Sequence, residues 1–178
     1  MSGARRFESL VMPHLDAGYN LARWLLRDGH DARDATQDAC LRALRSIDTL
    51  RGEQARPWFL TIVRHACYDW IERNPRPGDE ASQAIAAVDP RADPLLDAIR
   101  HAEADALAAA IAALPLAYRE VIVLRELEEL SYLEIARVAA IPIGTVMSRL
   151  ARARRLLRRS PLLEAVAPVR VVGQDTEP

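Results

Sequence analysis

The chain has 178 residues, room for one ordinary domain or two small ones, and half of them are hydrophobic, enough for globular cores. The formal net charge is −1, so the chain as a whole is not a general nucleic-acid binder. Charge is nevertheless segregated, because residues 75–113 carry three arginines and seven acids, whereas residues 114–160 carry nine arginines and five acids. Any negatively charged partner is therefore expected at the C-terminal part.

Apolar residues recur at helical spacing through residues 4–28, and Pro13 predicts a break or kink there. Asp31 is suited to cap a second helix, which we expect over residues 32 to about 50. This helix carries two sets of side chains. The inward-facing set is Ala35, Ala39, Leu41, Leu44 and Ile47, and the polar set is Asp34, Gln37, Asp38 and Arg42.

A third helix is expected to start at Pro57 and end near Asn74, with apolar residues on nearly all sides, which predicts a central position. Residues 75–94 mix Pro, Gly, Asp and Ser, a composition typical of a mobile, acidic tether. Residues 95–113 form an alanine-rich helical pattern, and Pro115 starts another helix that runs to about Glu129. The tail, residues 161–178, is expected to be loose, with residues 162–172 as an alternative short docking segment.

The last two predicted helices form a hairpin. Ser131 and Glu134 make a capping box at the start of the first, and Pro142 separates it from the second. Leu133, Ile135, Ala136 and Ala139 supply the apolar side of the first helix. Val146, Leu150, Ala153 and Leu157 form one buried stripe on the second, and six arginines with no acid lie between Arg149 and Arg159. The pattern predicts a helix-turn-helix that places its second helix in a DNA major groove; solvated arginines on a helical hairpin are the alternative.

Residues 114–158, LPLAYREVIVLRELEELSYLEIARVAAIPIGTVMSRLARARRLLR, resemble the promoter-reading domain of the extracytoplasmic-function (ECF) sigma factors, which are subunits of bacterial RNA polymerase. Residues 31–52, DARDATQDACLRALRSIDTLRG, resemble the helix with which this family grips the polymerase. Residues 55–74, ARPWFLTIVRHACYDWIERN, resemble its helix that opens DNA at the minus-10 element. Met147 departs from the family's usual cation, His65 from its usual asparagine and Thr61 from its usual arginine.

The resemblance implies an all-α fold of two small helical domains joined by a flexible linker, the second containing the helix-turn-helix. The implied parts are residues 1–74, the linker 75–94, residues 95–160 and the tail 161–178. It also implies three sets of contact residues. Polymerase contacts are Asp34, Gln37, Asp38, Leu41 and Arg42; minus-10 contacts are Glu53, Gln54, Ala55, Arg56, Arg64 and His65; minus-35 contacts are Thr145, Met147, Ser148, Arg149, Arg152 and Arg155.

The implied function is that of an alternative sigma factor, with core RNA polymerase, promoter DNA and an anti-sigma factor as partners. A helix-turn-helix regulator that is not a polymerase subunit is the alternative, and a sigma-like interaction module is a third possibility. The histidines show no metal-ligand spacing, and no glycine-rich phosphate loop is present, so we expect no enzyme, no catalytic residues, no metal and no cofactor. Asp34 and Asp38, one turn apart, remain open as a metal pair, a solvated face or a protein-binding stripe.

Two further expectations concern the cysteines and the location of the protein. Cys40 and Cys67 form neither a metal-type pair nor a disulfide framework, so we expect two buried thiols. No signal-peptide pattern opens the sequence, and no apolar run approaches membrane-spanning length. The sequence therefore predicts a cytoplasmic protein without membrane insertion.

Overall fold

The structure, a computed structural model, describes residues 3–52, 54–75 and 94–164, with residues 94–101 described by their backbone alone. Every element in these ranges is helical, which confirms the predicted all-α fold. The N-terminal helices are α1 (Gly3–Leu10), a 3-10 turn (Met12–His14), α2 (Leu15–Leu26), α3 (Gly29–Ser46), a second 3-10 turn (Ile47–Thr49) and α4 (Ala55–Arg73). The C-terminal helices are α5 (Pro94–Ala112), α6 (Leu116–Ile122), a π-helical turn (Val123–Leu127), α7 (Tyr132–Ala139), α8 (Ile143–Arg158) and α9 (Pro161–Glu164).

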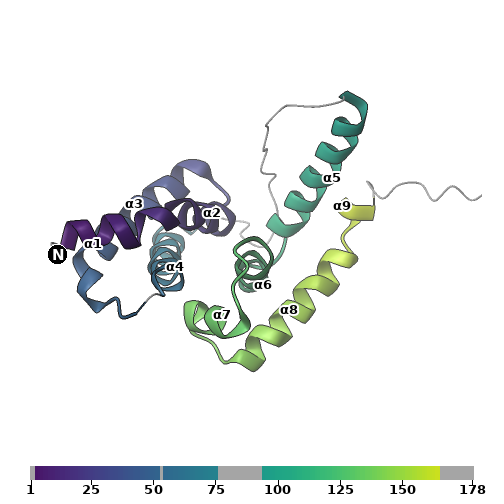
Figure 1. Ribbon diagram of the computed structural model, residues 1–178. Coiled ribbons are helices and arrows are strands. Elements are labelled where there is room, and N and C mark those ends of the chain that lie inside the picture. Colours follow the sequence, from purple (N-terminus) through teal and green to yellow (C-terminus); the bar gives the residue numbers. More distant parts are fainter. Residues whose placement is uncertain (1–2, 53, 76–93, 165–178) are drawn as a thin grey trace, which may run out of the picture.

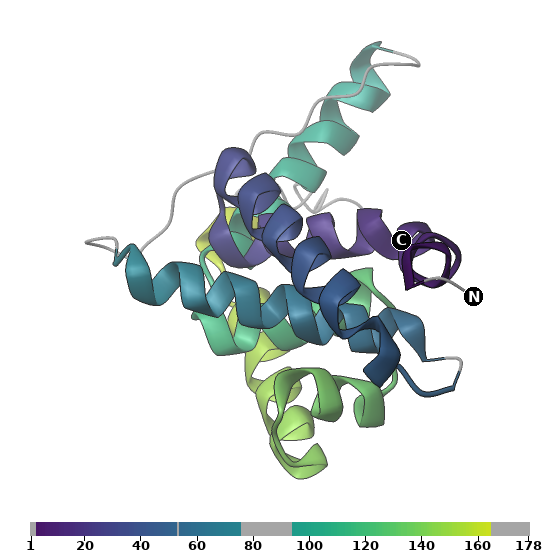
Figure 2. The same cartoon turned by 90° about the vertical axis from the view of Figure 1, so that its left-hand side faces the viewer.

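The helices form two groups that lie against each other. In Figure 1, α1 to α4 gather around the N-terminal side, α6 lies near the centre, and α7 lies below α4, while α8 runs away from α7 and α5 projects away from the N-terminal helices. Helix α4 contacts α2, α3 and α7, and α2 contacts α6. Figure 2, turned by 90°, shows the same projection of α5. Most of the predicted linker, residues 76–93, and the tail after Glu164 lie outside the described residues.

Helix α4 is the centre of the N-terminal group, as its apolar circumference predicts. Phe59, Leu60 and Val63 are completely buried. Gly18 of α2 lies against this side of α4, and a Cβ atom there would stand 2.6 Å from the Phe59 ring. The absence of a side chain at Gly18 therefore allows α2 and α4 to approach closely.

Helix α3 begins three residues earlier than expected. Asp28, and not Asp31, is its N-cap, because the Asp28 carboxylate accepts hydrogen bonds from the amides of His30 and Asp31. The predicted inward positions Leu41 and Leu44 were wrong, since these side chains are 49% and 41% exposed. Neither the C-terminal helices nor the other N-terminal helices cover this part of α3, so two leucines face solvent beside the polar stripe.

The predicted helical hairpin is α7 and α8. Both hydrogen bonds of the capping box join Ser131 and Glu134 at the start of α7. Val146, Leu150 and Ala153 are buried, which confirms the apolar stripe of α8. Leu133 was expected on the apolar side of α7 but is 53% exposed. The π-helical turn after α6 was not predicted, because no local residue pattern marks this change of helix geometry.

Candidate nucleic-acid and protein interfaces

The connection between α7 and α8 sets the orientation of α8. Ala140 adopts a left-handed conformation with φ 53°, and the Ile141 amide bonds back to the Ala136 carbonyl at 3.1 Å. Pro142 caps α8 at its N-terminus, in extended rather than helical geometry. The chain therefore changes direction within three residues. Two helices joined by so tight a turn, the second resting on the first through a buried stripe, form a helix-turn-helix.

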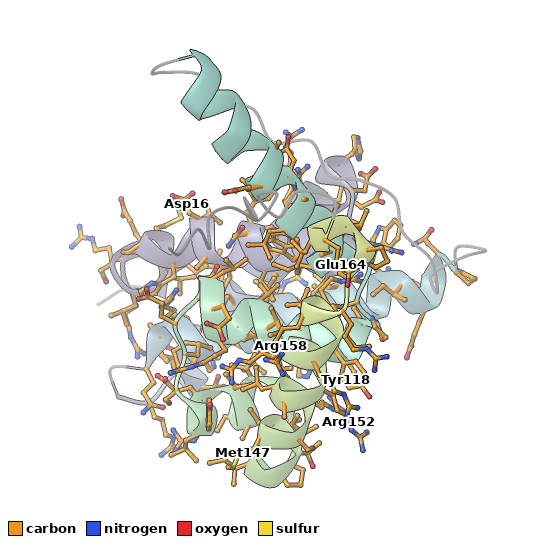
Figure 3. The ribbon with its side chains drawn as sticks, turned by 90° about the vertical axis from the view of Figure 1, so that its right-hand side faces the viewer. Asp16, Tyr118, Met147, Arg152, Arg158 and Glu164 are labelled. Atoms are coloured by element: carbon orange, nitrogen blue, oxygen red, sulfur yellow. The ribbon has the colours of Figure 1, made fainter. Side chains whose placement is uncertain are left out.

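The outer face of α8 carries the predicted minus-35 residues. Met147, Ser148, Arg152 and Arg155 are exposed, whereas Thr145 and Arg149 are half-buried. Figure 3 shows Met147 at one end of α8, with Arg152 and Arg158 further along the same helix. Arg154 pairs with Glu126 at 2.7 Å on the surface of the C-terminal helices. The buried stripe thus leaves a basic, solvent-facing side of the kind that binds DNA phosphates.

The predicted polymerase contacts lie on α3 but differ in their surroundings. Asp34, Gln37 and Leu41 are exposed along one face. Arg42 pairs with Asp38 at 2.7 Å and with Asp69 of α4 at 2.6 Å, so part of the polar stripe binds α3 to α4. Asp34 lies 3.3 Å from His30, one turn before it. Asp34, Gln37 and Leu41 therefore form an open surface, whereas Asp38 and Arg42 belong to an ion-pair network that joins α3 to α4.

Beside this stripe, a groove of about 530 Å³ runs between α2 and α3. Its lining residues are Leu15, Asp16, Tyr19, Arg33, Thr36, Gln37 and Cys40. Gln37 belongs to both the groove and the stripe, so a partner that contacts Gln37 meets an apolar hollow on one side and Leu41 on the other. Cys40 is half-buried in this groove, whereas Cys67 is buried as expected.

The predicted minus-10 residues lie where α4 meets the C-terminal helices. Gln54 accepts from Arg137 of α7 at 2.8 Å, Arg56 pairs with Glu128 at 2.6 Å, and Arg64 pairs with Glu120. His65 is exposed and Ala55 is buried, while Glu53 lies outside the described residues. Trp58 is half-buried and lines a small hollow of about 190 Å³ together with Gln54 and Arg137.

Glu120 is the most unusual charged group in this contact. Its side chain is completely buried, and burial raises its pKa, an effect that Arg64, Tyr68 and Arg149 oppose. The Arg64 guanidinium also lies over the Tyr68 ring, 4.2 Å from the ring centre. Burial and the nearby Glu120 charge raise the pKa of Cys67 and of Tyr68 to about 12. Both groups are therefore neutral at physiological pH.

Glu120, Glu128, Asn20 and Arg137 were not among the predicted site residues. Glu120 lies in the Tyr-Arg-Glu-Val motif, but no periodicity marks a bond to a helix more than fifty positions away. Among the described residues, no group of three or more His, Cys, Asp or Glu is arranged to hold a metal. Asp38 is paired with Arg42, which argues against a metal pair with Asp34. The helices in the described ranges are too short or too polar to cross a membrane.

Comparison with known proteins agrees with this arrangement of an α-helical N-terminal group and a C-terminal helix-turn-helix. The Sigma-70 region 2 family model matches residues 10–76, and the Sigma-70, region 4 model matches residues 104–157. The chain is 35% identical over 155 residues to the ECF RNA polymerase sigma factor SigE of Mycolicibacterium smegmatis, covering 85% of this chain and 60% of SigE. It is 32% identical over 164 residues to the ECF sigma factor SigW of Bacillus subtilis, covering 86% of this chain and 87% of SigW.

Among solved structures, the sigma factor RpoE of Bartonella quintana, crystallised with the anti-sigma factor NepR, superimposes with a TM-score of 0.70. The two are 25% identical, and the match covers 89% of this chain and 96% of RpoE. An all-helical chain that carries sigma region 2 followed by sigma region 4 belongs to the class of transcription initiation factors. The chain belongs to the ECF sigma factors of the sigma-70 family. The alternative of a helix-turn-helix regulator outside the polymerase is not favoured, because the N-terminal half matches sigma region 2.

Proposed function

We propose that this sigma factor binds core RNA polymerase through α3, opens promoter DNA with α4 and the loop before it, and reads the minus-35 element with α8. The observation that carries the proposal is the exposure of two separate surfaces, one on α3 and one on α8, within regions that match sigma regions 2 and 4. In this proposal, residues 1–74 bind core polymerase and separate the promoter strands, residues 75–94 act as a tether, and residues 95–160 bind the minus-35 duplex. The tail, residues 161–178, has no assigned part.

The polymerase contact is best assigned to the open half of the α3 stripe. Asp34, Gln37 and Leu41 are spaced three and four residues apart, which places them on one face of a helix. Leu41 is a large apolar side chain left in water, a feature typical of a protein-binding surface when polar residues surround it. Arg42 then supports this face, because it pairs with Asp38 on α3 and with Asp69 of α4.

The minus-35 contact is assigned to the outer side of α8. Thr145, Met147, Ser148 and Arg149 lie near its N-terminal end, the end that meets base edges in helix-turn-helix proteins. Arg152 and Arg155 lie further along, where phosphates run. Single-stranded minus-10 DNA would meet residues 53–56, Arg64 and His65, because an unstacked base needs a pocket and a polar wall.

The role needs no covalent chemistry from this chain, no catalytic residue and no cofactor. Its effect on transcription comes from lowering the free energy needed to separate DNA strands, since captured bases stay out of the duplex. Because it acts with the polymerase, we propose a cytoplasmic location. An anti-sigma factor is a further proposed partner, supported by the likeness to RpoE, which was crystallised with NepR.

Run-off transcription with purified core polymerase tests the function. The wild-type chain should direct initiation from promoters selected out of a random pool, and core polymerase alone should not. The variant Gln37→Ala/Leu41→Ala should lose co-purification with core polymerase while its circular dichroism stays unchanged. The matched control is Leu107→Ala, which removes a similarly exposed leucine from α5. A chain that binds promoter duplexes but never supports initiation would be a regulator instead.

A further inference from the structure

Two carboxylates of the C-terminal helices are paired with two arginines of α4. Arg64 donates to Glu120, and a nitrogen of Arg56 lies 2.6 Å from an oxygen of Glu128. The arginines are eight residues apart on α4, and the glutamates are eight residues apart on the opposing segment, in reverse order. The segments therefore run antiparallel and match arginine to carboxylate at both ends of the contact.

Both carboxylates are removed from water by this contact. The side chain of Glu120 is 0% exposed and that of Glu128 is 5% exposed. Tyr68 also donates to Glu120 at 3.3 Å, and Asn20 of α2 donates to Glu128 at 2.6 Å. These donors all come from the N-terminal helices, so separating the two groups would take them away from both acids. The charge of Arg149 of α8, which also lowers the pKa of Glu120, belongs to the C-terminal helices and would stay with Glu120.

An ion pair of this kind is specific without being strong. Removing a carboxylate from water costs several kcal/mol, and the attraction to a buried arginine roughly offsets that cost. A partly exposed partner such as Arg56 gains still less, because solvent screens its charge. A partner that offers the same arginines another anion can therefore exchange with the glutamates at little net cost.

The contact covers part of the predicted minus-10 surface, where His65 stays exposed, and leaves the minus-35 surface open. Gln54, Arg56 and Arg64, three of the residues assigned to the minus-10 element, are bonded to side chains of the C-terminal helices. The outer side of α8, with Arg152 and Arg155, faces solvent in the same arrangement. The α3 surface around Gln37 and Leu41 is also open.

We propose that, in the free chain, the C-terminal domain blocks the minus-10 surface, with Glu120 and Glu128 holding the two arginines that promoter phosphates would otherwise contact. Carboxylate and phosphate oxygens are both acceptors that a guanidinium binds, so DNA and the C-terminal domain compete for Arg56 and Arg64. The closed chain can still bind polymerase or duplex DNA, and strand capture follows only when the domains separate. This inference rests on the proposed function of α4.

Two independent variants of the full chain open the blocking contact. Glu120→Gln/Glu128→Gln keeps the shape of both side chains and removes their charge. Asn20→Asp acts from the other domain, by placing a second carboxylate beside Glu128. The matched control is Glu129→Gln/Glu164→Gln, which removes two charges from exposed positions of the C-terminal part and leaves every arginine pair described above intact.

The readouts are fluorescence anisotropy with a labelled single-stranded DNA of mixed sequence, over a salt series, and the radius of gyration from small-angle X-ray scattering. Freeing two arginines should tighten DNA binding by the Glu120/Glu128 variant. The slope of log K against the logarithm of the salt concentration should become steeper by about 1.4, which is about 0.7 for each new phosphate contact. Its radius of gyration should rise. Asn20→Asp should change both quantities in the same direction, and the control should match the wild type.

If both opening variants bind single strands like the wild type and stay as compact, the blocking contact is refuted. Should circular dichroism show that the double variant is unfolded, Asn20→Asp decides the question alone. Run-off transcription separates this result from the function itself. If the wild-type chain directs initiation and the opening variants change nothing, only the proposed blocking contact is refuted. If the wild-type chain never directs initiation, the proposed role of α4 is refuted as well.

Discussion

Arg42 of α3 and Asp69 of α4 form an ion pair of 2.6 Å, and the same guanidinium contacts Asp38 at 2.7 Å. Hydrogen bonds that Arg42 donates to Asp69 and Asp38 raise the pKa of Arg42 further, despite partial burial. Arg42, one of the residues that the family resemblance assigns to polymerase binding, therefore joins two helices of its own domain.

The first prediction follows from this pair. Arg42→Ala should lower the free energy of unfolding by about 0.5–1 kcal/mol, because the pair is partly exposed and screened by solvent. Gln37→Ala, at an exposed position of the same helix, should leave that free energy unchanged. Urea denaturation followed by circular dichroism measures both. Equal stability of the two variants would show that Arg42 has no structural part.

The second prediction separates base contacts from phosphate contacts on α8. In holoenzyme bound to minus-35 duplexes, Arg149→Ala should cost on the order of 1–3 kcal/mol and relax preference at one base pair. Arg155→Ala should weaken all sequences alike and reduce the salt slope by about 0.9. Met147→Arg should raise affinity with little gain in selectivity, because it adds a cation to an exposed position. Uniform loss of affinity in Arg149→Ala would contradict the placement of α8 in the groove.

The third prediction concerns the close approach of α2 and α4. Gly18→Ala should destabilise the protein by about 1–3 kcal/mol, because the new Cβ would meet the fully buried Phe59 ring at 2.6 Å. This loss exceeds the roughly 0.5–1 kcal/mol that alanine gains over glycine in a helix. Gly144→Ala is the control, since nothing lies within 4 Å of its added Cβ. Thermal or urea denaturation should show opposite signs for the two variants.

The fourth prediction is a pH dependence at the start of α7. Hydrogen bonds from the Ser131 hydroxyl and amide lower the pKa of Glu134. A carboxyl group whose pKa is lowered by folding contributes stability above its ordinary pKa, and that stability disappears as the pH falls through the lowered value. Glu134→Gln should therefore be less stable than the wild type at neutral pH and should approach it in acid. Parallel urea titrations at several pH values measure the difference, and a constant gap would contradict the assignment.

Short-range patterns predicted much of the fold correctly. The capping box of Ser131 and Glu134, the break at Pro13, the turn around Pro142 and the buried stripe of Val146, Leu150 and Ala153 depend on residues within about one turn of each other. The family resemblance was confirmed for regions 2 and 4. The contact residues assigned through it remain predictions.

The errors share one physical cause. Leu41, Leu44 and Leu133 were expected to face inward because they are apolar and suitably spaced, yet they are exposed. Periodicity shows that a helix has an apolar side, but the width of the side that becomes buried depends on which neighbour packs there. Asp28 replaced Asp31 as the cap of α3 for a similar reason, since both residues suit the role and the backbone after α2 decides between them.

The sequence by itself determined that the chain is helical, where most helices begin and end, and which family it belongs to, because capping, proline geometry and motif spacing act between near neighbours. Only the tertiary structure decided that Glu120 and Glu128 of one helix group neutralise Arg64 and Arg56 of the other. A buried charge is tolerated only where its partner lies opposite, and that position depends on how two segments more than fifty residues apart pack together.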